Sequence, residues 1–408
     1  MPAYIDSLFS GTAYSKALDN VPVELLEAMI LNLPYDYSSY RANYICAIIE
    51  NRNSEKWSQK ILEILKDIAV NHKNPEIGKP NVTNSEDKEM RSYDMLQSNA
   101  LNCVRGRAAR AIEQLLWQDS FLFQQFKNTI EKLALDENPA VKLASLFPLW
   151  PSYNIERKWA SEVILNLYEQ DYRIAGFHDT KNMLFLLYPQ YRERVLNIIQ
   201  KCYESEDEKL IEMGAHCLSE MFIRENEFVD VMDNVKAMSK IQSEAILHMA
   251  IIYFKKEEFN SLAKDMIRKF KLSTFDLEIP MARLFYDNLI DLERDKDFLI
   301  EIMNSDLSRR MIYAFVRYLE EESKSVVDYK DVILSMSHHL VENGDKEKGG
   351  WGVEDEISKL VIGLYDETSE STLPEMKDIA GECLDIWDLM FEKQIGPIRQ
   401  LSQKIMER

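Results

Sequence analysis

The amino-acid sequence predicts an all-α protein in which antiparallel helix pairs stack as an α-solenoid. Gly and Pro number only 12 each among 408 residues, which suits long helices joined by short connections. Apolar residues recur at helical spacing along most of the chain. Small residues near the expected helix centres recur at intervals of 30 to 37 residues, a period typical of helical repeats.

The clearest amphipathic helix lies in NALNCVRGRAARAIEQLLW, residues 99–117. Arg107 and Arg110 fall on its polar side, where we expect them to face solvent. Arg105 falls inside the apolar sector, so its charge must be paired or must reach past its neighbours to water. The apolar face of this helix holds Leu101, Val104, Ala108, Ala111, Ile112, Leu115 and Leu116.

Two more helices follow after short joints. DSFLFQQFKNTIEKLALDE, residues 119–137, is amphipathic, and Asn138 and Pro139 supply the N-cap and first-turn proline of NPAVKLASLFPLW. Short joints between three helices predict antiparallel hairpins. The small or compact residues that we place at successive helix centres are Ala108, Ser145, His178, Ala215, Ala245, Ala282 and Ala314.

The stretch DENPAVKLASL resembles the second helix of a HEAT repeat. The matching residues are Asp136, Pro139, Val141, Lys142 and Ser145. The resemblance implies a structural ladder in which the basic residue of one repeat pairs with the aspartate of the next, as Arg105 with Asp136, and in which Lys142 holds the next basic position. Glu212 stands where a later basic residue should be, which puts the ladder in doubt beyond the second repeat. The alternative for Arg105 is an anion site shared with Arg107 and Arg110.

Three longer strings look similar to the C-terminal helical-repeat regions of large bacterial STAND-type NTPases linked to anti-phage defence. They are NALNCVRGRAARAIEQLLW, FHDTKNMLFLLYPQYRE and CLDIWDLMFEKQIGPIRQL. In such proteins the repeats act as the sensor that recognises a foreign protein. The chain holds no GxxxxGK[ST] stretch, so the resemblance covers the sensor part only.

Breaks in the helical pattern predict three regions. Residues 1–98 form an N-terminal helical cap with a long loop at 72–94, residues 99–325 form HEAT-like repeats, and residues 326–408 form C-terminal helices with a loop at 342–352. The second loop presents an aromatic side chain among charges, a composition found at binding hot spots. Its candidate partner-binding residues are Trp351, Lys346 and Lys348.

Composition argues against several function classes. Lys and Arg number 49 and Asp and Glu number 69, so the net charge is −20 and phosphate backbones or anionic lipid are repelled.

The five cysteines are never spaced as CxxC, and the histidines lack an HExxH pair, so neither disulfides nor a zinc site are expected. No leader or long apolar run is evident, which predicts a cytoplasmic protein. An EF-hand-like spacing at 345–356 lacks ligands at Gly349 and Val353.

The sequence therefore predicts a non-catalytic protein-recognition or scaffold module that binds a protein partner on a curved surface. We expect no cofactor, no metal, no catalytic residue, no small-molecule substrate, and neither a membrane nor a nucleic acid as partner. The alternative is a HEAT-type nucleic-acid-binding protein or DNA-repair glycosylase, which would need a basic concave face.

Overall fold

Helices account for all regular structure in the described part of the chain. The structure is a computed structural model that describes residues 10–11, 13, 21–32, 40–75, 93–273, 275–305, 307–321, 324–343 and 353–393. These residues contain no strand, which confirms the all-α prediction.

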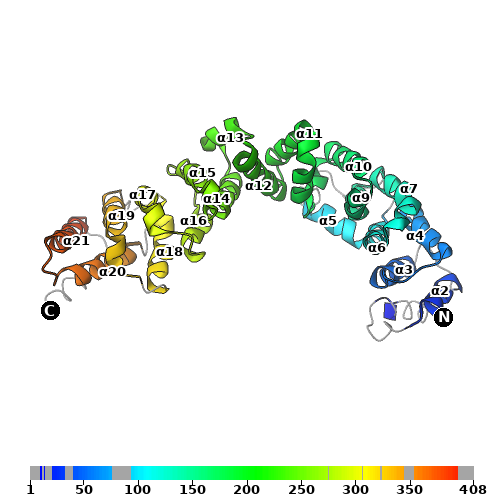
Figure 1. Ribbon diagram of the computed structural model, residues 1–408, viewed down its shortest axis with the longest axis horizontal. Coiled ribbons are helices and arrows are strands. Elements are labelled where there is room, and N and C mark those ends of the chain that lie inside the picture. Colours follow the sequence, from blue (N-terminus) through cyan, green and yellow to red (C-terminus); the bar gives the residue numbers. More distant parts are fainter. Residues whose placement is uncertain are drawn as a thin grey trace. The chain divides into compact units, whose positions relative to one another are not determined.

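The chain divides into two compact units, residues 1–214 and 215–408, and the boundary falls inside helix α12 (Glu208–Glu225) (Figure 1). The solenoid and the three-region division stay predictions.

Unit 1 is built of two helix layers. Helices α3, α6 and α9 pack one on the next in the first layer, and α4, α7 and α10 do so in the second (Figure 1). Its α-helices are α2 (Val23–Asn32), α3 (Arg41–Asn51), α4 (Gln59–Asn71), α5 (Tyr93–Asn102), α6 (Val104–Gln118), α7 (Phe123–Ala134), α8 (Pro139–Ala144), α9 (Leu146–Ile155), α10 (Arg157–Gln170) and α11 (Thr180–Tyr203). Two 3₁₀ turns, η3 (Ser120–Leu122) and η4 (Tyr172–Gly176), precede α7 and α11.

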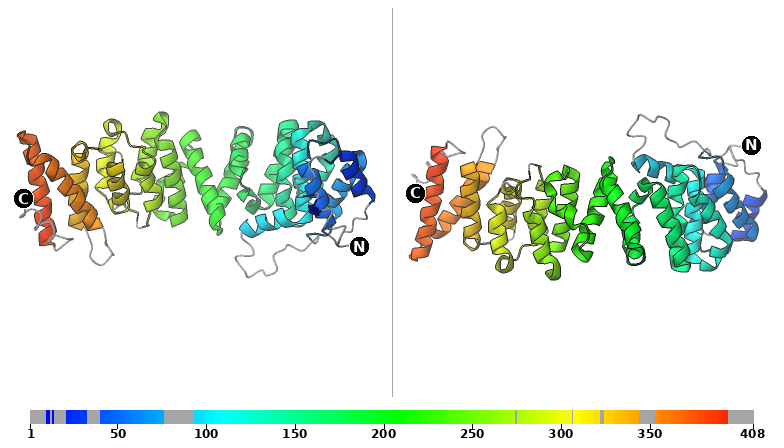
Figure 2. Two further views of the ribbon diagram at one scale, coloured as in Figure 1. Left: turned by 90° about the horizontal axis from the view of Figure 1, so that it is seen from below. Right: turned by 90° about the horizontal axis from the view of Figure 1, so that it is seen from above.

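Unit 2 repeats this layering. In its first layer α14 packs on α16, α16 on α18 and α18 on α20, and in its second layer α17 packs on α19 and α19 on α21. Figure 2 shows the helices of this unit side by side, in chain order. After α12 its helices are α13 (Val229–Asp233), η5 (Val235–Ala237), α14 (Lys240–Phe254), α15 (Glu257–Arg268), α16 (Glu278–Tyr286), α17 (Leu292–Met303), α18 (Ser308–Glu321), η6 (Val326–Tyr329), α19 (Lys330–Asn343), α20 (Val353–Thr368) and α21 (Pro374–Glu392).

Two helices predicted as continuous are broken. The helix of residues 99–117 divides at Cys103, whose extended backbone starts α6 and whose Sγ accepts a hydrogen bond from the Gly106 amide at 3.2 Å. The helix after Asn138 divides at Ser145 into α8 and α9. Pro148 explains the second break, because its ring removes an amide donor and clashes with the carbonyl four residues earlier.

Most of the predicted helix-centre positions are correct. The five alanines at these positions are buried inside α6, α12, α14, α16 and α18: Ala108, Ala215, Ala245, Ala282 and Ala314. Ser145 instead stands at the break between α8 and α9, and His178 lies in the turn before α11, with its side chain exposed and 2.8 Å from Asp179. The small side chains allow close packing of first-layer helices, whereas the histidine has no such role.

The two predicted loops can be compared with the structure only at their ends, where the neighbouring helices are described. The first begins after α4 as expected, but α5 already starts at Tyr93, and residues 76–92 lie outside the described residues. Helix α19 continues to Asn343, two residues into the predicted loop at 342–352, and residues 344–352 also lie outside the described residues.

A buried carboxylate anchors the second layer of unit 2. Asp295 of α17 has a fully buried side chain 2.7 Å from Lys264 Nζ of α15 and 2.7 Å from the Arg294 guanidinium. Burial by itself would raise the pKa of Asp295, but hydrogen bonds from Arg294 and Lys264 outweigh it and hold the pKa below its usual range. The ion pair with Lys264 therefore fixes α17 against α15.

We predict that Gly106→Ala destabilises the protein by about 1–3 kcal/mol, because the added methyl overpacks a tight corner. A Cβ at this position would lie 1.9 Å from the Ala100 carbonyl oxygen of α5. The matched control is Gly381→Ala in α21, where a Cβ would meet nothing within 4 Å. There the better helix propensity of alanine should stabilise by about 0.5–1 kcal/mol. Urea unfolding measures both, and equal losses in the two variants would refute the steric explanation.

Candidate functional site

The buried arginine of α6 is a structural anchor. Arg105 is fully buried, and its Nη1 donates a hydrogen bond to Asp136 Oδ2, which is the ion pair that the sequence predicts. Its Nη2 donates to the Pro75 carbonyl oxygen at 2.9 Å. The other oxygen of Asp136 accepts from the Asn138 amide at 2.8 Å. One guanidinium thus joins α6 to the segment that follows α4 and to the turn before α8, and two of its three nitrogens are used within the fold.

The ladder does not extend to the next repeat in the described residues. Lys142 is half-buried and makes no ion pair with any of them. Asp171, the acid that follows α10, is instead held by Arg173, with Nη2 and Oδ2 2.6 Å apart. No described residue forms an ion pair with Lys142, so its ladder role stays a prediction.

Arg107 and Arg110 do not form the solvated face that the helical projection predicts. Both converge on Glu50 of α3: Arg107 Nε lies 2.7 Å and Arg110 Nη2 3.2 Å from its carboxylate oxygens. Arg110 also lies over the Phe147 ring, 5.8 Å from its centroid. The projection shows where side chains leave one helix but not that α3 brings an acid there. Neither arginine is available as an anion site.

One carboxyl group beside this cluster has a strongly shifted pKa. Burial raises the pKa of Glu113 in α6 to about 7, while a hydrogen bond from Trp117 and the charge of Arg110 oppose the shift. The Trp117 side chain itself is 49% exposed. The first layer of unit 1 therefore holds a group that titrates near neutral pH.

Unit 2 carries a chain of polar side chains that links helices α16, α14 and α12. Arg283 of α16 donates from Nη1 to Nε2 of His248 in α14. His248 Nδ1 lies 3.3 Å from His216 Nε2 on α12, with the rings 5.3 Å apart. An arginine can only donate, so His248 must carry its proton on Nδ1 and donate to His216. Arg283 is also held 2.8 Å from Asp287.

Large exposed side chains surround this polar chain. The Arg317 guanidinium of α18 lies 5.7 Å from the centroid of the Tyr286 ring and 2.6 Å from Glu321. Tyr286 and Tyr313 are 55% and 39% exposed, and Ile252 and Ile279 are 42% and 80% exposed. We name as the α12–α18 face the residues His216, His248, Ile252, Ile279, Arg283, Tyr286, Tyr313 and Arg317.

Sequence reasoning missed this face, although a signal was present. His216, His248, Arg283 and Arg317 are separated by 32, 35 and 34 residues, close to the repeat period. They lie in turn on α12, α14, α16 and α18. The predicted partner-binding residues Trp351, Lys346 and Lys348 lie outside the described residues, so their role stays a prediction.

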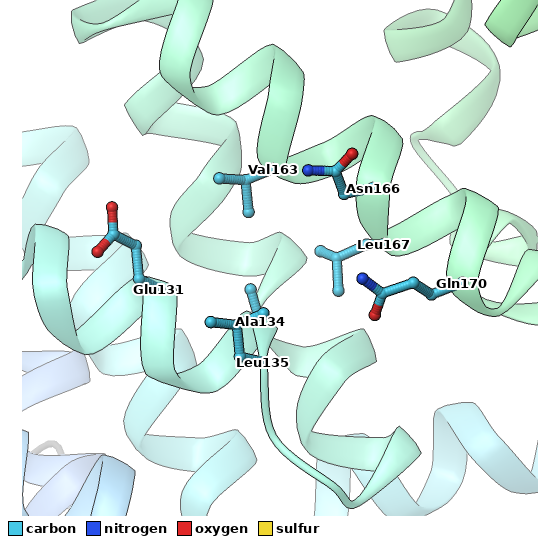
Figure 3. Close-up of a pocket in the computed structure, with 7 residues that line it drawn as sticks. All are labelled: Glu131, Ala134, Leu135, Val163, Asn166, Leu167 and Gln170. Atoms are coloured by element: carbon cyan, nitrogen blue, oxygen red, sulfur yellow. The ribbon is translucent and has the colours of Figure 1, made fainter.

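A cleft of about 260 Å³ separates α7 from α10 in unit 1. Figure 3 shows Ala134, Leu135, Val163 and Leu167 as its apolar lining, with Glu131, Asn166 and Gln170 around them. Glu131 already accepts from Trp159 Nε1 at 2.7 Å, and Asn166 from Arg194 Nη2 at 2.8 Å. Two of its three polar side chains thus serve the fold, and the cleft offers no organised polar set for chemistry.

Other kinds of site receive no support from the described residues. No group of three or more His, Cys, Asp or Glu among them could hold a metal ion, and none of their helices is long and apolar enough to cross a membrane. No protein-family model, curated protein or solved structure matches this chain.

We predict that Asp136→Ala destabilises the protein by about 3–5 kcal/mol, because it leaves the buried Arg105 without its counter-charge. The control is Glu156→Ala, which breaks a more exposed pair with Lys127 and should cost about 1 kcal/mol or less. Urea denaturation measures both free energies of unfolding. An unchanged transition for Asp136→Ala would show that the pair does not anchor the fold.

We predict that stability depends on pH through Glu113. Its folded-state pKa of about 7 exceeds the ordinary value of 4.5, so the folded protein binds the extra proton and loses stability as pH rises between these values. Glu113→Gln removes this loss. Its stability relative to the unmutated chain should rise by about 1–3 kcal/mol between pH 5 and pH 8. Urea unfolding at both pH values tests this, and a pH-independent difference would contradict it.

Proposed function

We propose that this chain is a protein-recognition module that binds a protein partner through the α12–α18 face. The observation that carries the proposal is the exposure of Tyr286 and Tyr313 beside Arg283 and Arg317 on adjacent helices. Tyrosine and arginine are the residue types that most often dominate binding energy at protein interfaces.

The polar chain supports the proposal because it orders the surface before binding. Arg283 is held by both His248 and Asp287, and Arg317 by both Tyr286 and Glu321. Side chains that are already fixed lose less conformational entropy when a partner arrives. One of these contacts places the Arg317 guanidinium over the Tyr286 ring, and arginine beside an aromatic ring is typical of protein interfaces.

Charge favours a protein partner over a nucleic acid. The net charge of −20 opposes a phosphate backbone. Arg107, Arg110 and Arg283 each have an acidic neighbour within 3.2 Å, which reduces their attraction for phosphate. The resemblance to sensor regions of STAND-type NTPases supports a narrower form of the proposal, in which the partner is a foreign protein and the module acts together with an NTPase.

The test compares capture of partners by three forms of the full chain. The unmutated chain, Tyr286→Ala/Tyr313→Ala and the control Leu272→Ala are immobilised and exposed to lysates of the source cells, before and after phage infection. Leu272 is 77% exposed but lies outside the face. Quantitative mass spectrometry should show a protein held by the unmutated and control chains and reduced about tenfold or more by the double variant, because two interface aromatics are truncated.

Two outcomes would count against the proposal. Equal capture by all three chains would show that the α12–α18 face is not the contact surface. Retention of the unmutated chain on heparin or an oligonucleotide, weakening steeply with salt, would favour the nucleic-acid alternative. An NTPase among the captured proteins would support the narrower form.

A further inference from the structure

Acidic residues concentrate on the last two described helices. Residues 353–393 hold 12 Asp and Glu but only 3 Lys, whereas the whole chain has 69 acids and 49 bases. About a tenth of the sequence thus carries nearly half of the net charge of −20. This surplus distinguishes α20 and α21 from the rest of unit 2.

Helix α21 has a second apolar stripe besides its buried face. Ile379, Cys383, Ile386 and Met390 are buried, and the helix packs on α19 and α20. On another side Leu373, Leu384 and Phe391 are 59%, 42% and 64% exposed. Leu384 and Phe391 are 7 residues apart, close to two helical turns, so they share one side of the helix, and Leu373 is the N-cap residue at its start.

The stripe is open along its length. Gly381 falls on the same side by helical geometry, and a Cβ built on it would meet nothing within 4 Å. Lys377 and Asp388 also fall within the stripe. The Leu373–Phe391 stripe is therefore a face of α21 that the other described residues leave uncovered.

Acidic side chains border this stripe. Asp378, Asp385 and Glu392 follow one another at 7-residue intervals and are exposed. Together with Asp388 they form no ion pair with any described residue. In contrast, Glu375, farther round the helix, is paired with Lys330 of α19. Four carboxylates thus flank or interrupt an exposed apolar line without a cation of their own.

We propose that the Leu373–Phe391 stripe docks a basic amphipathic helix of a partner protein. Leucine-sized side chains of such a helix pack between Leu384 and Phe391, while its lysines or arginines meet Asp378, Asp385, Asp388 and Glu392. Charge selects this occupant. A second copy of the chain would bring acids against acids, and a nucleic acid or an anionic lipid surface is repelled for the same reason.

This surface is separate from the α12–α18 face, since α21 belongs to the second layer of unit 2 and α14, α16 and α18 to the first. The inference therefore goes beyond the proposed function and does not depend on it. A single chain with both surfaces could hold two protein segments at once.

The experiment measures binding of synthetic 18-residue peptides to the full chain by fluorescence anisotropy. The probes are an amphipathic Leu/Lys helix, the same composition scrambled to abolish amphipathicity, and an amphipathic Leu/Glu helix. We expect the Leu/Lys helix to bind at least tenfold more tightly than the other two. A benzophenone group on this peptide should crosslink within α21.

Three variants separate the contributions. Leu384→Ser/Phe391→Ser and Asp385→Asn/Asp388→Asn/Glu392→Gln should each weaken binding of the Leu/Lys helix about tenfold, through lost apolar contact and lost charge respectively. The matched control Glu225→Gln/Asp230→Asn/Glu258→Gln removes three exposed acids elsewhere in unit 2 and should change affinity less than twofold. Circular dichroism confirms that each variant is folded, as expected for substitutions of exposed side chains.

Several results would overturn the proposal. An equal loss in the matched control would show general charge attraction, and unchanged binding by Leu384→Ser/Phe391→Ser would show that the stripe is not the dock. A dimer in sedimentation velocity that this double variant abolishes would assign the stripe to self-association. Tyr286→Ala/Tyr313→Ala should bind the peptide normally, so failure of this inference and failure of the proposed function are distinguishable.

Discussion

The architecture of unit 1 depends on one buried cation. Arg105 has no access to water, so its charge has to be met by Asp136 and by the Pro75 carbonyl oxygen. Meeting that requirement brings the segment that follows α4 and the turn before α8 to the same point on α6. Apolar burial alone is non-directional and would tolerate small shifts of these segments. The N–H donors of the guanidinium point in fixed directions, so the oxygen atoms that they bind can occupy only a few positions.

Unit 2 meets the same demand differently. Its fully buried Asp295 is satisfied by Lys264 and Arg294, while Arg283, His248 and His216 form a hydrogen-bonded chain near the surface. A buried ion pair fixes the fold. A half-exposed chain of donors and acceptors instead leaves its edges open to a partner, which is why the α12–α18 face is the candidate site and the interior pairs are not.

The two surfaces of unit 2 have different chemistry. The α12–α18 face mixes arginine with tyrosine and isoleucine, and its charges are mostly balanced by neighbours. The side of α21 that bears Leu384 and Phe391 is bordered by carboxylates without cations. The two surfaces differ in local charge balance, which the net charge of −20 does not reveal. A surface whose charges are balanced distinguishes partners by shape, whereas a surface with unpaired charges distinguishes them by the sign of their charge. Both properties suit the protein-binding role proposed above.

The sequence by itself determined the all-α class, the approximate helix positions, the buried alanines of α6, α12, α14, α16 and α18, and the pairing of Arg105 with Asp136. The first three follow from helical periodicity, which is a local rule. The need of Arg105 for a counter-charge follows from its place in the apolar sector, whereas the choice of Asp136 followed from the resemblance to a HEAT repeat. Only the tertiary structure decided that Glu50 pairs with Arg107 and Arg110, and that His216, His248 and Arg283 meet. A helical projection gives the direction of a side chain but not its neighbour, because the neighbour lies on another helix some 30 or more residues away and its register is set by the packing of the whole layer.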